Sequence, residues 1–365
     1  MKIEITIDSD EFWARLVRDV RAARHSVRIQ TLSFEGDLVG TALADLLAGS
    51  TAPDRRILVD SYTRFIISDR VIHSPANLLD RGLRAEVRET RRMIERLKAG
   101  GVGVKFTNPV GPFLNRFPAR NHKKLILIDN EIAYLGGINF SEHNFAWHDM
   151  MLRFEDPTLH EFLSRDFEHT WAGRNQNTSG EFGDVEIHLL NGRASGESFE
   201  TIFRVLDRAE REIVVQSPYL SFPFVEKLEE AQRRGVAVHV ITPERNNYQT
   251  MKDYLLWRAP RAGIAVWLYP ERMTHLKAML VDDRELIVGS ANFDWLSFAF
   301  CQEIVAIIRD TGVIADFRKR VVTKDLRESE RFTGPARPVK GRLADLQLRT
   351  VSRALGAIAR LNPRA

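Results

Sequence analysis

The chain contains one pattern of residues twice, and this repeat constrains the fold more than any other feature. "HKKLILID" runs from His122 to Asp129, and "HLKAMLVD" runs from His275 to Asp282. Each copy consists of His, any residue, Lys, four residues and Asp, and a stretch with Gly, two residues and Asn follows it ("GGIN" and "GSAN"). Two copies in a chain of 365 residues predict two related domains rather than a single large core.

The regions before the motifs also resemble each other. "RAARHSVRIQTLSF" (21–34) and "RAEREIVVQSPYLSF" (208–222) each close a helix with helical apolar spacing and enter a β-branched strand, and a second helix and strand follow. This alternation predicts an α/β fold. We expect two α/β/α sandwich domains, each with a mainly parallel sheet, that are related by a pseudo-twofold axis and share an active site at their interface.

The expected domains are residues 1–178 and 184–365, because the polar, glycine-containing stretch Gly173–Asp184 has the composition of a linker. Gln30 matches Gln216 with a shift of 186, whereas His122 matches His275 with a shift of 153. The difference of 33 residues predicts an insertion in the first domain, at about residues 63–100, which contains a charged helix. This helix is either a solvated surface or a lid that contacts a lipid headgroup.

The composition limits the class of protein. The net charge of +4 and the pI near 9.2 favour anionic partners. The N-terminal residues lack the pattern of a signal peptide, no stretch approaches the roughly 18 apolar residues of a membrane span, and the single cysteine, Cys301, excludes an internal disulfide. We therefore expect a cytoplasmic protein that associates peripherally with the inner face of the membrane, as a monomer or an oligomer of unknown size.

Each motif reads as a hairpin of two buried strands. A two-residue turn at Asn130 and Glu131 would place the motif histidine opposite the asparagine, and the motif lysine opposite a small residue. The expected pairs are His122–Asn139, Lys124–Gly137, His275–Asn292 and Lys277–Ser290.

The clustered side chains suit a phosphodiester. Lysines and asparagine amides can hold its oxygens and stabilise the charge that develops on phosphorus. One histidine can attack as a nucleophile while the other protonates the leaving oxygen, so the chemistry needs no metal and no cofactor. The expected catalytic residues are His122, Lys124, Asn139, His275, Lys277 and Asn292, and Gly137 and Ser290 are expected to line the substrate pocket.

The acidic residues near the motifs are expected to play two different roles. Asp129 lies seven residues beyond His122, or roughly 23 Å along a strand, so it cannot reach the same phosphate. We expect Asp129 and Asp282 to be structural residues at turns. Asp149 and Glu303 are better placed to orient the histidines through the second ring nitrogen.

These motifs resemble the phospholipase D superfamily. "RNHKKLILIDNEIAYLGGINFSEH" and "SPYLSFPFVEKLEEAQRRGVAVHVITP" look most like the cardiolipin synthase branch. The resemblance implies a metal-independent transfer through a phosphohistidine, with His122 as the nucleophile and His275 as the general acid. The chain departs from the usual second motif at Leu296 and Cys301, which leaves the acceptor alcohol open.

The expected function is therefore a phosphatidyl transfer between phospholipids, most like cardiolipin synthesis from phosphatidylglycerol. The alternatives are a hydrolase that releases phosphatidic acid, a nuclease that cuts DNA or RNA, and a lipid-binding module with a decayed site. Against the nuclease, the sequence has no run of basic residues interleaved with the aromatics that stack bases. Against the decayed module, His, Lys and Asn are intact in both copies.

Two segments could contact a membrane. The loop 108–122 places Phe113, Leu114 and Phe117 among arginines, and either dips into the headgroup layer or packs on the neighbouring domain. The basic C-terminal helix has apolar residues that are expected to share one face, which would either pack on its own domain or lie on a membrane. These residues are Leu343, Leu346, Val351, Leu355 and Ile358.

Overall fold

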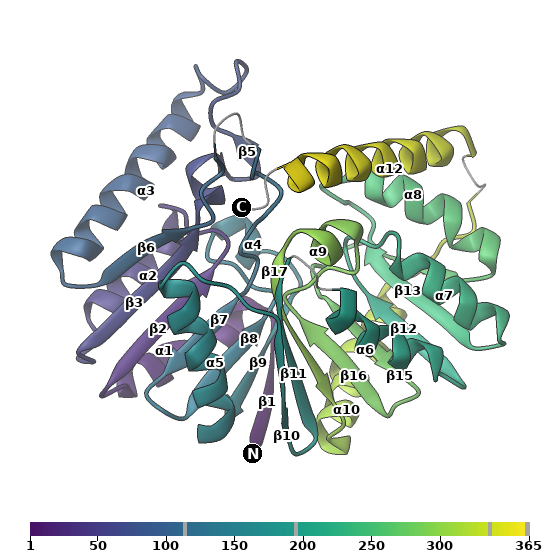
Figure 1. Ribbon diagram of the computed structural model, residues 1–365, viewed down its shortest axis with the longest axis horizontal. Coiled ribbons are helices and arrows are strands. Elements are labelled where there is room, and N and C mark those ends of the chain that lie inside the picture. The colour runs from purple at the N-terminus through teal and green to yellow at the C-terminus, as the bar shows by residue number, and fades with distance from the viewer. Residues whose placement is uncertain (112–114, 193–195, 335–337, 362–365) are drawn as a thin grey trace. The chain divides into compact units, whose positions relative to one another are not determined.

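The computed structural model describes residues 1–111, 115–192, 196–334 and 338–361, and the chain divides into two compact units, Met1–Gln176 and Asn177–Ala365 (Figure 1). Phe113 and Leu114, the expected apolar tips of the loop 108–122, lie outside the described residues. No helix among the described residues is long and apolar enough to cross a membrane.

Unit 1 is built on a seven-stranded sheet in the order β1-β9-β8-β7-β2-β3-β6. The strands are β1 (Lys2–Ile7), β2 (Ser26–Thr31), β3 (Asp54–Asp60), β6 (Gly103–Thr107), β7 (Leu125–Ile128), β8 (Ile132–Gly136) and β9 (Met150–Glu155). The helices are α1 (Asp8–Ala22), α2 (Leu38–Ala48), α3 (Arg81–Ala99), α4 (Glu142–Phe145), α5 (Pro157–Trp171) and the 3-10 helix η1 (Ser61–Arg64). A short hairpin, β4 (Ile66–Ile67) and β5 (Arg70–Val71), precedes α3.

The motif strand β7 lies in the middle of this sheet and is buried on both faces. Ile126 and Ile128 belong to the core that α1, α2 and α3 cover, together with Phe12, Leu43 and Met93. Because side chains alternate along a strand, Leu125 and Leu127 point to the other face, where α5 packs. Helices on both faces make unit 1 an α/β/α sandwich.

Unit 2 repeats this strand order in a nine-stranded sheet, β10-β11-β17-β16-β15-β12-β13-β14-β18. The strands are β10 (Thr178–Phe182), β11 (Val185–Asn191), β12 (Glu212–Gln216), β13 (Ala237–Pro243), β14 (Ala265–Tyr269), β15 (Ala278–Val281), β16 (Glu285–Gly289), β17 (Gln302–Ile308) and β18 (Glu330–Arg331). The helical segments are α6 (Gly196–Asp207), α7 (Phe224–Arg233), α8 (Gln249–Arg258), η3 (Pro260–Ala262), α9 (Trp295–Ala299), α10 (Thr311–Phe317), the π-helical turn η4 (Arg318–Val322), α11 (Thr323–Glu328) and α12 (Pro338–Leu361).

The expectation of mainly parallel sheets is wrong in both units. Only β2, β3 and β6 in unit 1, and β12, β13 and β14 in unit 2, run parallel to one another. The other pairs are antiparallel. Within each motif this follows from the tight turn that joins its two strands, because such a turn reverses the chain. The helix-strand alternation therefore predicted one half of each sheet.

The expected insertion at about 63–100 is only part of the length difference. Residues 61–102 separate β3 from β6, whereas residues 244–264 separate β13 from β14. The remaining difference lies mainly between β6 and His122, where residues 108–121 correspond to the shorter segment 270–274. Two matched positions, Gln30 with Gln216 and His122 with His275, give the total number of inserted residues between them but not where those residues lie. Helix α3 keeps its charged residues on a solvated face, as one of the two interpretations expects, while Met93 and Leu97 are buried in the main core.

The stretch Gly173–Asp184 is only in part a linker. Residues 178–182 form β10, which pairs antiparallel with β11, so the second unit begins at Asn177 rather than at residue 184. Its polar composition suits this position, because β10 lies at the edge of the sheet and keeps much of its surface in water.

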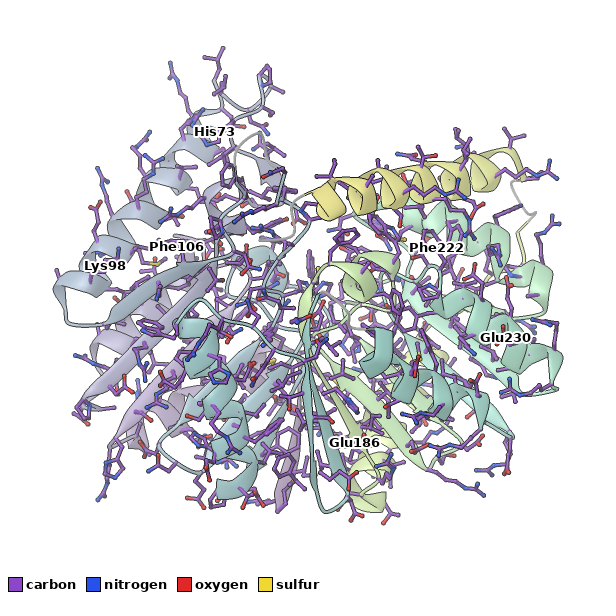
Figure 2. The ribbon with its side chains drawn as sticks, viewed as in Figure 1. His73, Lys98, Phe106, Glu186, Phe222 and Glu230 are labelled. Carbon is purple, nitrogen blue, oxygen red and sulfur yellow. The ribbon has the colours of Figure 1, made fainter. Side chains whose placement is uncertain are left out.

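The C-terminal helix α12 packs through a different face from the one expected. Ala344 and Leu348 are buried against α8, and a Cβ atom at Gly341 would lie 2.1 Å from Trp257. Arg349 covers the ring of Phe222 at 4.7 Å, beneath α12 (Figure 2). Of the predicted stripe, Leu343, Leu346, Val351 and Ile358 are exposed and only Leu355 touches the core. Small residues such as Gly341 and Ala344 allow the close approach to α8. A pattern of large apolar residues does not identify this face, because these small residues have little hydropathy of their own.

Candidate active site

The motif hairpins have three-residue turns, and this corrects the expected register. Ile128 pairs with Ile132, and Val281 pairs with Glu285. The main-chain N–H of Gly289 donates to the carbonyl of Lys277 at 3.3 Å, so this lysine faces Gly289 rather than Ser290. The same register in unit 1 places Lys124 opposite Gly136 and His122 opposite Ile138. Asp129 and Asp282 supply the extra residue, since both adopt left-handed backbone conformations (φ of 54° and 55°) that Asp tolerates.

Each motif lysine bends back onto its own histidine. The Nζ of Lys124 donates to the main-chain carbonyl of His122 at 2.8 Å, and the Nζ of Lys277 donates to that of His275 at 2.5 Å. Both lysines are 1% exposed. The side chains around one motif, with its histidine, lysine and asparagine, are called the half-site of that unit, and each half-site thus holds an ammonium group out of water. A buried ammonium next to an imidazole provides a strong attraction for a phosphate oxygen.

The second half-site also joins the two side chains directly. The Nζ of Lys277 lies 2.9 Å from Nδ1 of His275. Because an ammonium group can only donate, Nδ1 must be the acceptor, and a neutral imidazole then carries its proton on Nε2. A neutral imidazole is not an acid near neutral pH, so a proton transfer from His275 requires the imidazolium, in which Nδ1 also carries a proton.

Gly137 and Ser290 contact the acidic residues rather than the lysines. A Cβ atom at Gly137 would lie 2.2 Å from Oδ1 of Asp149, and the hydroxyl of Ser290 donates to Oε2 of Glu303 at 2.5 Å. Oε1 of Glu303 accepts from Ser297 at 2.9 Å, and both carboxylates are buried. The two acids occupy equivalent places. Asp149 precedes Met150, whose carbonyl accepts from the N–H of Gly137, and Glu303 precedes Ile304, whose carbonyl accepts from the N–H of Ser290. That they orient the histidines stays a prediction.

The motif asparagines differ between the units. Asn139 donates to Asn144 at 3.2 Å and accepts from the hydroxyl of Thr31 at 3.4 Å. Within the described residues, the buried Oδ1 of Asn292 has no hydrogen-bond partner, and neither do the amide of Gln216 and the hydroxyl of Thr274. Buried polar atoms without a partner are costly, so the second half-site has polar groups that a bound molecule can satisfy.

The motif aspartates lie at the turn end of their hairpins. The carboxylate of Asp129 accepts from the main-chain N–H groups of Arg24, His25 and Ser26 at 2.7–3.1 Å. Asp282 accepts in the same way from Glu210, Arg211 and Glu212 at 2.8–2.9 Å. Burial opposes ionisation of both groups, yet these N–H donors hold the pKa of each carboxyl below its ordinary value. The contacts support a structural role.

The sequence reasoning missed a buried network that holds the segment before His122. Asp60 accepts from the main-chain N–H of Asn121 at 2.6 Å and from the guanidinium of Arg120 at 2.7 Å. Gln30 donates to the side-chain oxygen of Asn121 at 2.8 Å. Burial raises the pKa of Asp60 to about 6, although Arg120 and the N–H donors lower it. The glutamine that both halves place at the same position, Gln30 and Gln216, is the sequence feature that could have indicated this network.

Lys123, the variable residue of the first motif, points away from the histidine. Its Nζ contacts both oxygens of Asp166 on α5 at 2.7 Å, and neither side chain is exposed. Leu276 occupies the equivalent place in unit 2 and is also buried. One unit therefore joins its motif strand to the covering helix by an ion pair, whereas the other uses an apolar residue.

One group of acids among the described residues could hold a cation. Carboxylate oxygens of Glu35, Asp37 and Glu86 lie within 4.8 Å of one another in unit 1. Burial, together with the charges of Glu86, Asp37 and Asp69, raises the pKa of Glu35 to about 8, although the main-chain N–H of Ser68 lowers it. Glu35 is therefore mostly protonated near neutral pH, which makes it a poor metal ligand.

Comparisons with known proteins agree with this fold and with the motifs. The family model described as "Cardiolipin synthase, PLD-like domain" matches residues 16–171 and 202–323. The chain is 27% identical over 348 residues to cardiolipin synthase A of Yersinia pseudotuberculosis serotype O:1b (strain IP 31758), and the match covers 86% of this chain and 67% of the relative. Cardiolipin synthase A of Yersinia pestis bv. Antiqua (strain Angola) matches to the same extent.

Solved structures confirm the predicted α/β fold. Phosphatidylserine synthase from Haemophilus influenzae Rd KW20 superposes with a TM-score of 0.72 at 14% identity, and the match covers 97% of this chain and 94% of that one. Polyphosphate kinase from Porphyromonas gingivalis superposes with a TM-score of 0.61 at 13% identity, over 96% of this chain and 53% of that one. At such low identity these similarities show the fold alone.

Proposed function

Since this chain belongs to the family described as cardiolipin synthase, phospholipase D-like domain, we propose that it transfers a phosphatidyl group between alcohols, with phosphatidylglycerol as the donor. The predicted membership of the phospholipase D superfamily is confirmed by the family match, and the chain is an enzyme of that superfamily. The observation that carries the proposal is the buried lysine that rests on the motif histidine in both units.

The proposed reaction has two steps. A ring nitrogen of His122 attacks phosphorus, the bond from phosphorus to the headgroup oxygen breaks, and protonated His275 gives a ring proton to that oxygen and becomes neutral. An acceptor hydroxyl then loses its proton to His275 and attacks phosphorus, and the bond between phosphorus and His122 breaks. Lys124, Lys277, Asn139 and Asn292 stabilise the charge on the phosphoryl oxygens.

The proposed reaction uses one histidine from each motif, and it needs no metal. The assignment of His122 as the nucleophile comes from the family resemblance. The role of His275 as the general acid also comes from the family resemblance. It requires the protonated ring, so Lys277 must release Nδ1 for that step. We propose that Asp149 and Glu303 orient the two histidines from their buried positions.

We further propose that the protein works at the surface of an anionic membrane. The side of α12 that faces away from α8 exposes Val339, Leu343 and Leu346 by 62–79%. Lys340 and Arg342 are exposed beside them, and the acidic Asp345 is paired with Arg349. Apolar side chains flanked by cations on an exposed helix are typical of helices that lie in a headgroup layer.

The test is an assay of the purified protein in EDTA, with vesicles of phosphatidylglycerol in one tube and single-stranded DNA in another. Mass spectrometry would identify the products. Cardiolipin or another transphosphatidylation product supports the transferase. Phosphatidic acid as the sole product would establish a hydrolase instead, and cut DNA with intact lipid would establish a nuclease. A strict need for an added divalent cation would refute the metal-free mechanism.

A further inference from the structure

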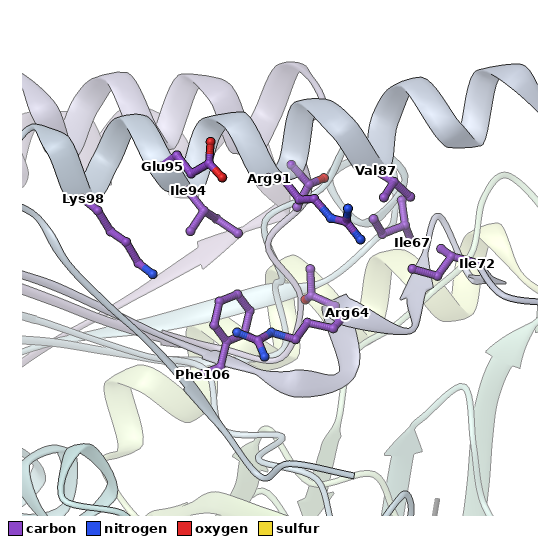
Figure 3. Close-up of a pocket in the computed structure, with 11 residues that line it drawn as sticks. Arg64, Ile67, Ile72, Val87, Arg91, Ile94, Glu95, Lys98 and Phe106 are labelled. Carbon is purple, nitrogen blue, oxygen red and sulfur yellow. The ribbon is translucent and has the colours of Figure 1, made fainter.

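A cavity of about 360 Å³ lies beneath α3 in unit 1 (Figure 3). It is open to solvent on one side and is lined by residues of α3, β6, η1 and β4 and by Ile72, which follows β5, and its walls are largely apolar. The apolar side chains are Ile67, Ile72, Val87, Ile94 and Phe106. Four of these side chains are buried, and Phe106 is partly exposed.

The cavity exists because two hydrophobic clusters do not join. The main core of the unit includes Met93 and Leu97 from the second half of α3. A separate small cluster consists of Ile67, Ile72, Leu83 and Val87. Natural interiors are close-packed, and an unfilled apolar space of this size forgoes many van der Waals contacts. Its volume falls at the lower end of the range for small-molecule sites, roughly 300–1,000 Å³, which suits one acyl chain.

The charged residues that line the cavity are mostly cationic. Arg64, Arg91 and Lys98 are exposed, and Glu95 is the acidic member of the lining. The guanidinium of Arg64 lies 3.9 Å from the centroid of the Phe106 ring, which holds it beside the apolar wall. Across the described residues, none of the three cations has a carboxylate within 4.0 Å. Elsewhere on α3, Arg92 is paired with Glu89 at 2.6 Å.

We propose that this cavity binds one acyl chain of an anionic lipid, with the acidic headgroup on Arg64, Arg91 and Lys98. Burial of the chain contributes about 0.8 kcal/mol per methylene, and the unpaired cations select an anionic head over a neutral one. The choice of a lipid among anionic amphiphiles rests on the proposed function. The site is distinct from the motif residues, since none of them lines the cavity.

The cavity is connected to the first half-site through one turn of the chain. Thr63 and Arg64 of η1 form part of its wall, and Asp60 immediately precedes this helix. Asp60 accepts from the main-chain N–H of Asn121, the residue before His122. A lipid in the cavity would therefore rest against the turn that positions the histidine segment.

The experiment is a calorimetric titration of the full chain, carrying His122→Ala so that no probe is consumed, with dodecyl phosphate below its micelle concentration. We expect saturable binding that inorganic phosphate and dodecanol do not reproduce. Arg91→Glu and Ile94→Phe should each weaken this binding about tenfold or more, because one reverses a charge at the headgroup and the other fills the cavity. Arg88→Glu, on the same helix but outside the lining, should leave it unchanged.

A parallel titration with phosphatidylglycerol vesicles distinguishes the source of the lipid. Sensitivity of vesicle binding to Arg91→Glu shows that a membrane lipid enters the cavity, whereas sensitivity confined to dodecyl phosphate shows a site for free single-chain lipids. Either result supports the site. Absence of saturable dodecyl phosphate binding, equal binding by Arg91→Glu and Arg88→Glu, or equal competition by inorganic phosphate would overturn it. Because no turnover is measured, a failed transferase assay would not affect this outcome.

Discussion

Replacement of Asp129 by asparagine separates structure from catalysis within the first motif. The carboxylate accepts three main-chain N–H groups at the start of β2, and Asp129 itself has a φ of 54°. Asparagine is nearly the same size and tolerates the left-handed conformation, but it has a single acceptor oxygen and no charge. The change therefore removes hydrogen bonding without adding backbone strain.

The expected loss of stability follows from these contacts. Hydrogen bonds to a charged group contribute about 1.5–3 kcal/mol each, but water can replace the carboxylate at the exposed Arg24 and His25. We therefore expect Asp129→Asn to lower the free energy of unfolding by about 2–3 kcal/mol. Asp129→Ala removes every acceptor and adds left-handed strain of roughly 1–2 kcal/mol, so it should cost more. Glu131→Gln, an exposed charge in the same turn, should change stability by less than about 0.5 kcal/mol.

The pH dependence provides a further check of the same contact. The pKa of Asp129 is lower in the folded protein, so its contribution is present above the unfolded pKa of about 3.9 and is lost as the pH falls through the folded value. The stability difference between wild type and Asp129→Asn should thus be constant near neutral pH and shrink below about pH 4.

The assay combines urea denaturation with initial rates of phosphatidyl transfer at a temperature where every variant is folded. Folded Asp129→Asn should retain kcat/KM within about tenfold of wild type, because strand β7 separates it from His122. Asp282→Asn should behave in the same way in unit 2. A folded Asp129→Asn protein with wild-type stability and a loss of more than about a hundredfold in kcat would refute the structural assignment.

Three further predictions concern other parts of the molecule. His122→Ala should abolish turnover and the covalent intermediate while unfolding as a cooperative unit like wild type; a phosphorylated intermediate that persists, detected by intact-protein mass spectrometry, would place the nucleophile elsewhere. Glu35→Gln should be more stable than wild type at pH 9, by on the order of 3–5 kcal/mol, because a raised folded pKa of about 8 means that stability is lost as the pH rises from 4.5 to 8. Urea titrations of both proteins at pH 5 and pH 9 check this. The same stability difference between variant and wild type at both pH values would contradict it. Leu343→Glu with Leu346→Glu should weaken sedimentation with phosphatidylglycerol vesicles, whereas Leu38→Glu, at a comparably exposed leucine on α2, should not. Equal effects of both would remove α12 from the membrane contact.

The sequence determined the duplication, the α/β class and the chemistry of the motifs. These depend on local information: the spacing of His and Lys two residues apart fixes their shared face on a strand, and the helix-strand alternation fixes the parallel half of each sheet. In both units the lysine indeed lies against the motif histidine. The roles of these residues in catalysis remain a proposal.

The tertiary structure decided what local patterns leave open. A left-handed Asp129 lengthened the turn and shifted the register by one residue, so that Gly137 contacts Asp149 rather than facing Lys124. Helix α12 packs through Gly341 and Ala344, because close approach to Trp257 and α8 needs small residues rather than large apolar ones. The anchor of the histidine segment at Asp60 and the cavity under α3 both join residues far apart in the sequence. The spacing of residues along the chain does not predict such contacts, because they depend on how helices and loops pack against the assembled sheets.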